Sequence, residues 1–146
     1  MQGMTRFIYI CDTHMGADEV KLRQQGYSEY LAEILTALKT YLHGRGDIDF
    51  VLHGGDMINT LSDAAVVEAV TAFDLGVPVH LCLGNHDLDA PTAVERWLAL
   101  APGFFDDSGT PMYTVATEDC RIHVVPNHWC EEPYYWRDAL NSQFST

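Results

Sequence analysis

The chain has 146 residues, of which 47% are hydrophobic, and this is enough to bury the core of one domain. Twenty-one acidic residues against eight basic ones give a formal charge of −13, and a field of this sign repels phosphate backbones, which argues against nucleic acid as a partner. No apolar run reaches the roughly 18 residues of a membrane span, and the first residues lack the pattern of a signal peptide, so we expect a soluble protein without a membrane partner.

The four cysteines favour a reducing compartment. They form no Cys-x-x-Cys pair, and Cys11 and Cys82 lie within apolar runs, where a free thiol behaves as a small hydrophobic group. Disulfides are rare in cytoplasmic proteins. We therefore expect reduced cysteines and a cytoplasmic location.

The chain begins with a strand, a loop and a helix. Residues 6–11 (RFIYIC) form a short apolar run without helical spacing, which predicts a buried strand, and the polar residues 12–26 predict a loop. Apolar residues then recur at helical spacing, with Ser28 as the expected N-cap and Gly44 as the expected stop. This stripe consists of Tyr30, Leu31, Ile34, Leu35, Leu38 and Leu42.

The alternation continues to residue 100. Residues 48–52 (IDFVL) predict a second strand, and residues 62–76 predict a helix that begins after Ser62 and stops at Gly76. A third strand is expected at residues 77–83 (VPVHLCL), and a third helix opens at residues 89–91 (DAP), because proline is tolerated in a first turn. This β-α-β-α-β-α order predicts parallel strands joined by crossover helices, an α/β fold.

The pattern changes after residue 102. Residues 112–116 and 121–125 are two short β-type runs on either side of residues 117–119 (TED), which predicts a hairpin. Residues 103–111 are the expected boundary between the two parts. The chain contains no internal repeat, and we expect residues 1–146 to belong to a single domain.

A group of polar residues follows each of the three predicted strands. These groups are Asp12-Thr13-His14, Gly54-Gly55-Asp56 and Gly84-Asn85-His86-Asp87. Because the carboxyl ends of parallel strands share one edge of a sheet, we expect the three groups to converge there. Each alone would also fit a solvated loop, a turn or a helix cap. Their common position and order favour a site.

The residue types in these groups suit metal ions. Asp12 and His14, two residues apart, offer an oxygen and a nitrogen donor to one ion. Asp56 follows two glycines that let the backbone bend sharply, and its two carboxylate oxygens can bridge two ions. Asn85 offers a neutral amide oxygen to the second ion.

The neighbours of Asn85 suggest a role beside the metal. His86 can face the substrate, and Asp87 can accept the other N–H of its ring and so hold the ring in one tautomer. We therefore expect His86 and Asp87 to form a catalytic pair.

The order of the three motifs resembles that of the calcineurin-like metallophosphoesterases, and the resemblance covers residues 5–89. It implies a two-sheet αββα sandwich, of which this chain would hold the first β-α-β-α-β half and the start of the second sheet. It also implies that Asp12 and His14 bind the first metal, that Asp56 bridges, that Asn85 binds the second and that His86 assists the leaving group. An aspartate at position 87 leans toward the phosphodiesterase-like branch, because the protein phosphatases usually carry glutamate there.

The resemblance further implies hydrolysis of a phosphate mono- or diester, with a small phosphoester such as a nucleotide as the substrate. Two cations roughly 3.5 Å apart would clamp phosphate oxygens and lower the pKa of a bridging water. Asp, Asn and His suit manganese, iron and zinc alike. His86 would then donate a proton or a hydrogen bond to the departing alkoxide.

The chain departs from the family in its last third. The family carries a further histidine after a later strand and a Gly-His-x-His segment, and no Gly-His-x-His occurs here. His128 is the candidate for the first of these metal ligands, although it could instead cap a turn or stack beside Trp129, and His123 is expected to point outward from the hairpin. We therefore expect the complete protein to continue beyond Thr146.

Two other classes of function remain open. One is a nuclease of the same superfamily, against which the charge of −13 weighs. The other is a catalytically incomplete metal-binding module. Outside the three motifs, His53 is interpreted as a packing or supporting residue, and His80 as a core residue of its strand.

Overall fold

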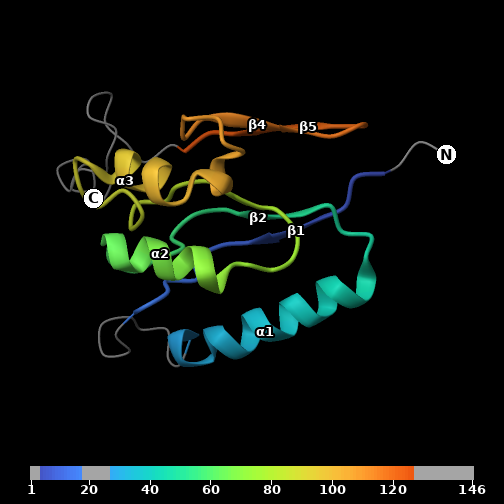
Figure 1. Cartoon of the computed structure of the whole chain (residues 1–146), viewed down its shortest axis with the longest axis horizontal. Helices are drawn as coiled ribbons and strands as arrows, with labels where there is room; N and C mark the ends of the chain where they lie inside the picture. Colours follow the sequence, from blue (N-terminus) through green and yellow to red (C-terminus); the bar gives the residue numbers. More distant parts are fainter. Residues whose placement is uncertain (1–3, 18–26, 127–146) are drawn as a thin grey trace, which may run out of the picture.

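The computed structural model describes residues 4–17 and 27–126 of the chain. Their elements follow in the order β1, α1, β2, α2, β3, α3, η1, β4, β5, where η1 is a short 3-10 helix. Helix α1 and the β4–β5 hairpin lie on opposite sides of the sheet that β1, β2 and β3 form (Figure 1). The alternation of strands and helices up to α3 confirms the predicted α/β fold.

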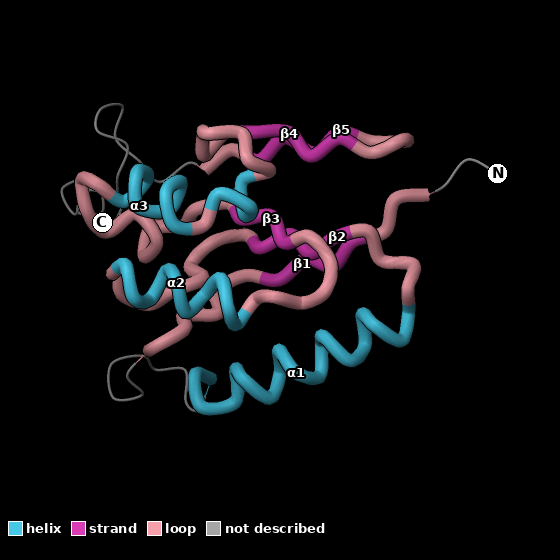
Figure 2. Tube along the Cα trace, viewed as in Figure 1, coloured by secondary structure: helices cyan, strands magenta, loops and turns pink. Residues whose placement is uncertain are grey.

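The central sheet is parallel, with β2 in the middle. It consists of β1 (Phe7–Ile10), β2 (Phe50–His53) and β3 (Val79–Leu81), each of which overlaps one of the predicted strands (Figure 2). Phe7 pairs with Phe50, and Val51 pairs with Val79. Because all three strands run the same way, the residues that follow them lie at one edge, which we call the carboxyl edge.

Helix α1 (Tyr27–Arg45) is longer at both ends than the sequence predicts. Ser28 lies within the helix, so the prediction that it is the N-cap is wrong, because an N-cap must precede the first helical residue. The predicted stop is also wrong. Gly44 is tolerated as a helical residue, and Gly46, with a φ of 65°, provides the left-handed residue beyond the helix end.

Helix α2 (Asp63–Ala72) starts as predicted: the Ser62 hydroxyl accepts the N–H of Ala65 at 3.1 Å. It ends before the predicted stop at Gly76, which instead lies in the following turn with a φ of 80°. Helix α3 (Ala93–Leu100) begins after the predicted opening at residues 89–91, and Thr92 is its N-cap residue.

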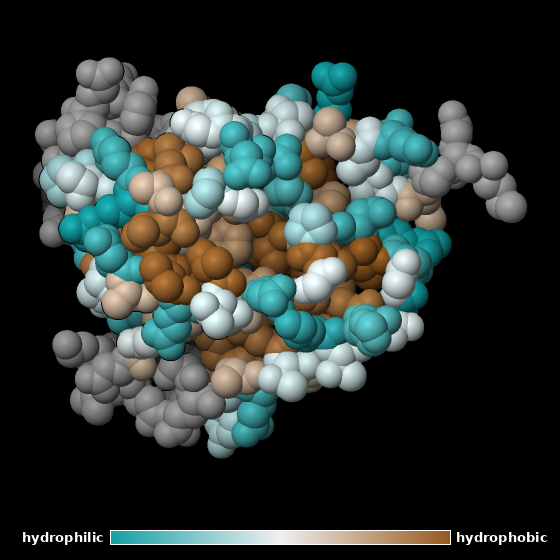
Figure 3. All heavy atoms as spheres, in the orientation of Figure 1, coloured by the Kyte–Doolittle hydropathy of each residue, from teal (hydrophilic) through white to brown (hydrophobic). Residues whose placement is uncertain are grey.

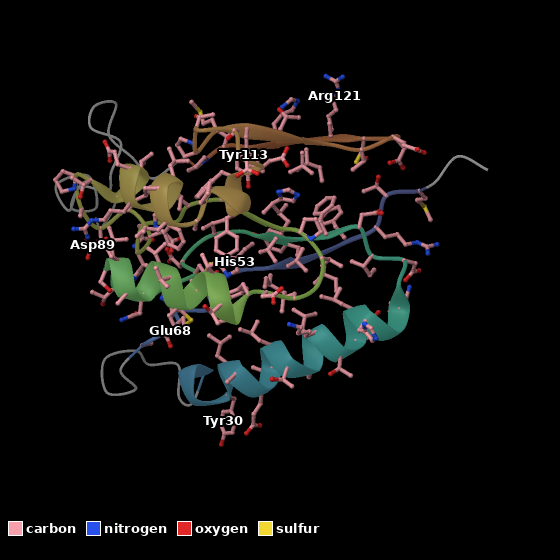
Figure 4. All side chains as sticks on the ribbon, in the orientation of Figure 1. Tyr30, His53, Glu68, Asp89, Tyr113 and Arg121 are labelled. Atoms are coloured by element: carbon pink, nitrogen blue, oxygen red, sulfur yellow. The ribbon has the colours of Figure 1, made fainter. Side chains whose placement is uncertain are left out.

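The predicted hairpin is present as β4 (Tyr113–Ala116) and β5 (Arg121–Val124), paired antiparallel. The Tyr113 hydroxyl lies 2.9 Å from the carbonyl oxygens of Leu81 in β3 and of Phe104 in η1 (Pro102–Phe105). The contact with Leu81 joins the hairpin to the sheet. Figure 4 shows Arg121 pointing away from the sheet. His123 is exposed and its Nδ1 lies 2.9 Å from the Thr114 hydroxyl, in agreement with the prediction that it points outward.

One hydrophobic core runs from α1 across the sheet to the hairpin. Trp97, Phe73 and Phe105 are its largest fully buried side chains. On the face drawn in Figure 3, apolar residues gather across the middle of the molecule, bordered by polar ones. As predicted, His80 is a core residue, 5.2 Å from the Phe50 ring in centroid distance. Within the described residues, no helix is both long and apolar enough to cross a membrane.

Candidate metal centre

The first two loops of the carboxyl edge continue the pairing of β1 with β2. The N–H of Asp12 donates to the Gly55 carbonyl, and the N–H of His14 donates to the Asp56 carbonyl, both at 2.9 Å. Farther along, Met15 forms a parallel bridge with Ile58. The motif around Asp12 and the motif around Asp56 are therefore held side by side by backbone hydrogen bonds.

Three predicted metal ligands have unusual backbone conformations. Asp12, His14 and Asp56 have φ values of 55°, 42° and 51°. Residues other than glycine rarely adopt positive φ, and such conformations persist where the surrounding structure enforces them, often at functional sites. Here the backbone hydrogen bonds between the first and second loops enforce these conformations. These conformations accompany the approach of His14 Nε2 to carboxylate oxygens of Asp12 and Asp56.

The third loop reaches the second through glycine. A Cβ on Gly55 would lie 2.9 Å from the Gly84 nitrogen, and a Cβ on Gly84 would overlap the Asp56 side chain. The N–H of His86 donates to Asp56 Oδ1 at 2.9 Å. All three motifs therefore meet around the Asp56 carboxylate, as the position of the motifs after parallel strands predicts.

The donor atoms converge at this point. His14 Nε2 lies 3.8 Å from an oxygen of Asp12 and 3.8 Å from an oxygen of Asp56, and the His14 and His86 rings meet edge to face at 4.7 Å. One ligand atom from each of His14, Asp56 and His86 fits within a mutual distance of 4.8 Å. A metal ion about 2.0–2.2 Å from each donor fits such spacings, and the mixture of carboxylate and imidazole suits transition metals. These residues therefore fit a metal ion.

The remaining predicted site residues are placed less decisively. The Asp12 side chain is 59% exposed, and its contact with the candidate ligand group is the approach of its carboxylate to His14 Nε2. Asn85 is half-buried in the turn before His86, and its carbonyl accepts the Leu88 N–H at 3.3 Å. Its role as a ligand of a second ion stays a prediction. His128 lies outside the described residues.

The predicted pairing of Asp87 with the His86 ring is wrong. His86 Nδ1 lies 2.7 Å from the carbonyl oxygen of Asn59, so a proton on Nδ1 is donated to that backbone group. Asn59 itself is fixed by its N–H, which donates to the Met15 carbonyl at 3.0 Å. The His86 ring is thus oriented by the loop after Asp56, and its Nε2 is left for a metal ion or a substrate.

Asp87 binds backbone groups instead. Its side chain is fully buried and accepts the N–H groups of Met57, Ile58 and Gly84, at 3.0, 3.2 and 2.9 Å. Burial raises the pKa of Asp87 to about 7, although the backbone donors act in the opposite direction. Asp87 therefore joins the second loop to the third, and does not act on the His86 ring.

A second buried link joins the first loop to the second. His53, at the end of β2, lies between the sheet and α2 (Figure 4) and is fully buried. Its ring meets the Phe73 ring edge to face. Its Nε2 lies 2.9 Å from the Thr13 hydroxyl, and its Nδ1 accepts the Gly55 N–H at 3.2 Å. Burial lowers the pKa of His53 to about 4, so the ring is neutral. The interpretation of His53 as a supporting residue agrees with this geometry.

A comparison with protein families agrees with this arrangement. The sequence profile of the calcineurin-like phosphoesterases matches residues 5–145, almost the whole chain. No curated protein matches the chain. The matched region contains all three loops of the carboxyl edge and the hairpin after them. On this match, the chain belongs to the calcineurin-like phosphoesterase family.

Proposed function

We propose that this chain hydrolyses a small phosphate mono- or diester with the help of two metal ions at the carboxyl edge. One observation carries the proposal: His14 Nε2 lies 3.8 Å from carboxylate oxygens of both Asp12 and Asp56, with the His86 ring against it. Three loops distant in sequence thus present acidic and imidazole donors to one point. When bound, the ions polarise the phosphate and supply a hydroxide nucleophile at neutral pH.

The residues of the candidate site have separate roles in binding the ions and in assisting the leaving group. Asp12 and His14 would hold one ion, Asn85 would hold the other through its amide oxygen, and Asp56 would contribute its carboxylate to both. Asn59 fixes the His86 ring through Nδ1, so that Nε2 can face the leaving oxygen and give it a hydrogen bond or a proton. The substrate is a small phosphoester such as a nucleotide, and an aspartate at position 87 favours the diesters among these. Manganese, iron and zinc all suit this donor set.

The test replaces the central carboxylate. Asp56→Asn keeps the shape of the side chain, and asparagine tolerates the positive φ at this position, so the variant should fold. We expect kcat/KM for bis-p-nitrophenyl phosphate to fall more than about 100-fold, because loss of groups that merely orient ligands already costs 10–100-fold. Metal content, measured by mass spectrometry of the bound ions, should fall with it. Asp49→Asn, an exposed carboxylate before β2, is the matched control and should change neither.

The outcomes separate the candidate functions. Wild-type protein that hydrolyses p-nitrophenyl phosphate esters only with added metal supports the proposal. Protein that binds metal without hydrolysis supports the non-catalytic metal-binding module, and protein that does neither overturns the site. His86→Asn distinguishes two roles: retained metal with lost activity supports action on the leaving group, whereas lost metal makes His86 a ligand.

We also infer a cytoplasmic location from the cysteine pattern. Cys11, Cys82 and Cys120 are free thiols. Burial raises the pKa of the Cys82 thiol, which keeps it protonated and unreactive.

A further inference from the structure

His53 and Thr13 form a buried hydrogen-bonded chain beneath the candidate metal centre. The Thr13 hydroxyl lies 2.9 Å from His53 Nε2 and donates to the Met57 carbonyl at 3.0 Å. Both side chains are buried, Thr13 with 5% of its surface exposed and His53 with none. Neither residue belongs to the candidate group of metal ligands, His14, Asp56 and His86.

The direction of every hydrogen bond in this chain is fixed. A backbone N–H can only donate a hydrogen bond, so His53 Nδ1 must be the acceptor for the Gly55 N–H. The ring proton must therefore lie on Nε2. Nε2–H then donates to the Thr13 oxygen, and the Thr13 proton goes to the Met57 carbonyl. No group is left without a partner, and a buried network that is fully satisfied is rigid.

The anchor points of this chain flank the predicted ligands. Thr13 lies between Asp12 and His14, and the two backbone groups, Gly55 N–H and Met57 C=O, lie on either side of Asp56. The hydrogen bonds therefore join Thr13 of the first loop to Gly55 and Met57 of the second, which are the neighbours of Asp56. They lie on the buried side of the two loops.

We propose that His53 and Thr13 are positioning residues that set the spacing between Asp12, His14 and Asp56, and with it the affinity for the first metal ion. This inference rests on the proposed metal site and extends it. The positive φ of Asp12, His14 and Asp56 gives the link its importance, because residues in this region relax toward ordinary conformations unless they are held. The backbone hydrogen bonds between the first and second loops hold the main chain. The hydrogen bonds of His53 and Thr13 hold Thr13, the residue between the predicted ligands Asp12 and His14.

The test removes one hydroxyl. Thr13→Val keeps the shape and the β-branch of the side chain but can neither accept from His53 nor donate to Met57. We expect the dissociation constant for Mn²⁺, measured by calorimetric titration of the whole chain, to rise about 10- to 100-fold, the usual cost of removing a group that orients ligands. Thr13→Ser keeps the hydroxyl and should bind Mn²⁺ within about threefold of wild type.

The matched control is Thr36→Val in α1, where the threonine hydroxyl also donates to a backbone carbonyl, that of Ala32, but far from the site in the chain. It should leave Mn²⁺ affinity unchanged. A purely structural role for Thr13 would lower the free energy of unfolding without changing the Mn²⁺ affinity of the folded protein, and this result would overturn the proposal.

A second pair of variants covers the case in which Thr13→Val does not fold. His53→Gln keeps a donor near the position of Nε2, whereas His53→Phe keeps only the ring shape. Weaker Mn²⁺ binding by His53→Phe than by His53→Gln supports the proposal, and equal binding contradicts it. Mn²⁺ affinity is measured independently of turnover, so the link can fail while the wild type still binds metal and hydrolyses esters. If wild type itself binds no Mn²⁺, the metal site and this inference both fall.

Discussion

The two ends of the central sheet are built in opposite ways. At the carboxyl edge, buried side chains join three loops, and three residues other than glycine have positive φ. At the amino edge, the turns before β2 and β3 are held by exposed ion pairs, namely Arg45 with Asp47 at 2.8 Å, Arg6 with Asp47, and Lys39 with Asp74 at 3.5 Å. The Arg45 guanidinium holds the pKa of Asp47 at about 2.

The difference shows which signals point to function in this fold. The amino edge contains a cavity of about 510 Å³ beside Lys39, His43 and Leu75, yet these side chains do not present a set of ligands to a common point. The carboxyl edge has convergent donors, unusual backbone conformations and buried hydrogen bonds. In this molecule, convergent donors on enforced backbone identify the candidate site better than cavity size does.

The largest effect on the free energy of unfolding should come from replacing Asp87. Asp87→Ala leaves the N–H groups of Met57, Ile58 and Gly84 buried without an acceptor, and we expect a loss of about 3–5 kcal/mol in the free energy of unfolding. Urea unfolding followed by circular dichroism measures it. Asp49→Ala is the control at the amino edge, because Asp49 accepts one backbone N–H, that of Arg6, at an exposed position. It should cost less than about 1 kcal/mol. Equal losses would remove the contrast between the two edges.

A smaller effect should appear in the pH dependence of stability. The pKa of His53 is about 4 in the folded protein and 6.5 ordinarily, so between these values the unfolded chain binds a proton that the folded one does not. Its contribution to stability is therefore complete above pH 6.5 and lost as the pH falls, by about 2 kcal/mol between pH 7 and pH 5.

The raised pKa of Asp87 acts in the opposite direction over the same range, so the comparison must be made against His53→Gln. Unfolding in urea with a chelator present, at pH 7 and pH 5, should show a steeper loss for wild type than for the variant. Parallel pH dependence of the two proteins would show that His53 is protonated as easily in the folded state as in the unfolded one.

The smallest effect should come from Lys39 at the amino edge. Lys39→Ala removes the ion pair with Asp74 and a hydrogen bond to the Asp74 carbonyl, both exposed to solvent. We expect less than about 1 kcal/mol in unfolding free energy and no change in metal binding or ester hydrolysis. A lost activity in this variant would show that the large cavity beside Lys39 takes part in function after all.

The sequence predicts the fold better than the details of the site. Apolar runs and helical spacing locate every helix and strand described except η1, and Ser62 caps α2 as its position suggests. Helix ends are less predictable, because Gly44 and Gly46 are equally suitable by residue type and only the backbone geometry selects Gly46. Strand ends locate the motifs, because parallel pairing alone brings them to one edge.

Contacts made through the backbone are invisible in a sequence. Asp87 and His86 are neighbours of suitable chemistry, which predicts a pair, but the acceptor for the His86 ring is the backbone carbonyl of Asn59, a group that every residue carries. The same is true of the N–H groups that bind Asp87. Only the position of His53 before two glycines indicated that a residue outside the motifs could support the site.

The close approach of Gly84 to Asp56 also bears on how this fold can diversify. Since a side chain at position 84 would overlap the Asp56 carboxylate, and the first loop is hydrogen-bonded to the second, no one of the three loops can be exchanged alone. We therefore expect the three loops to change together, as a matched set. The turns of the opposite edge, joined to their neighbours through solvent-exposed charges, are free to vary one at a time.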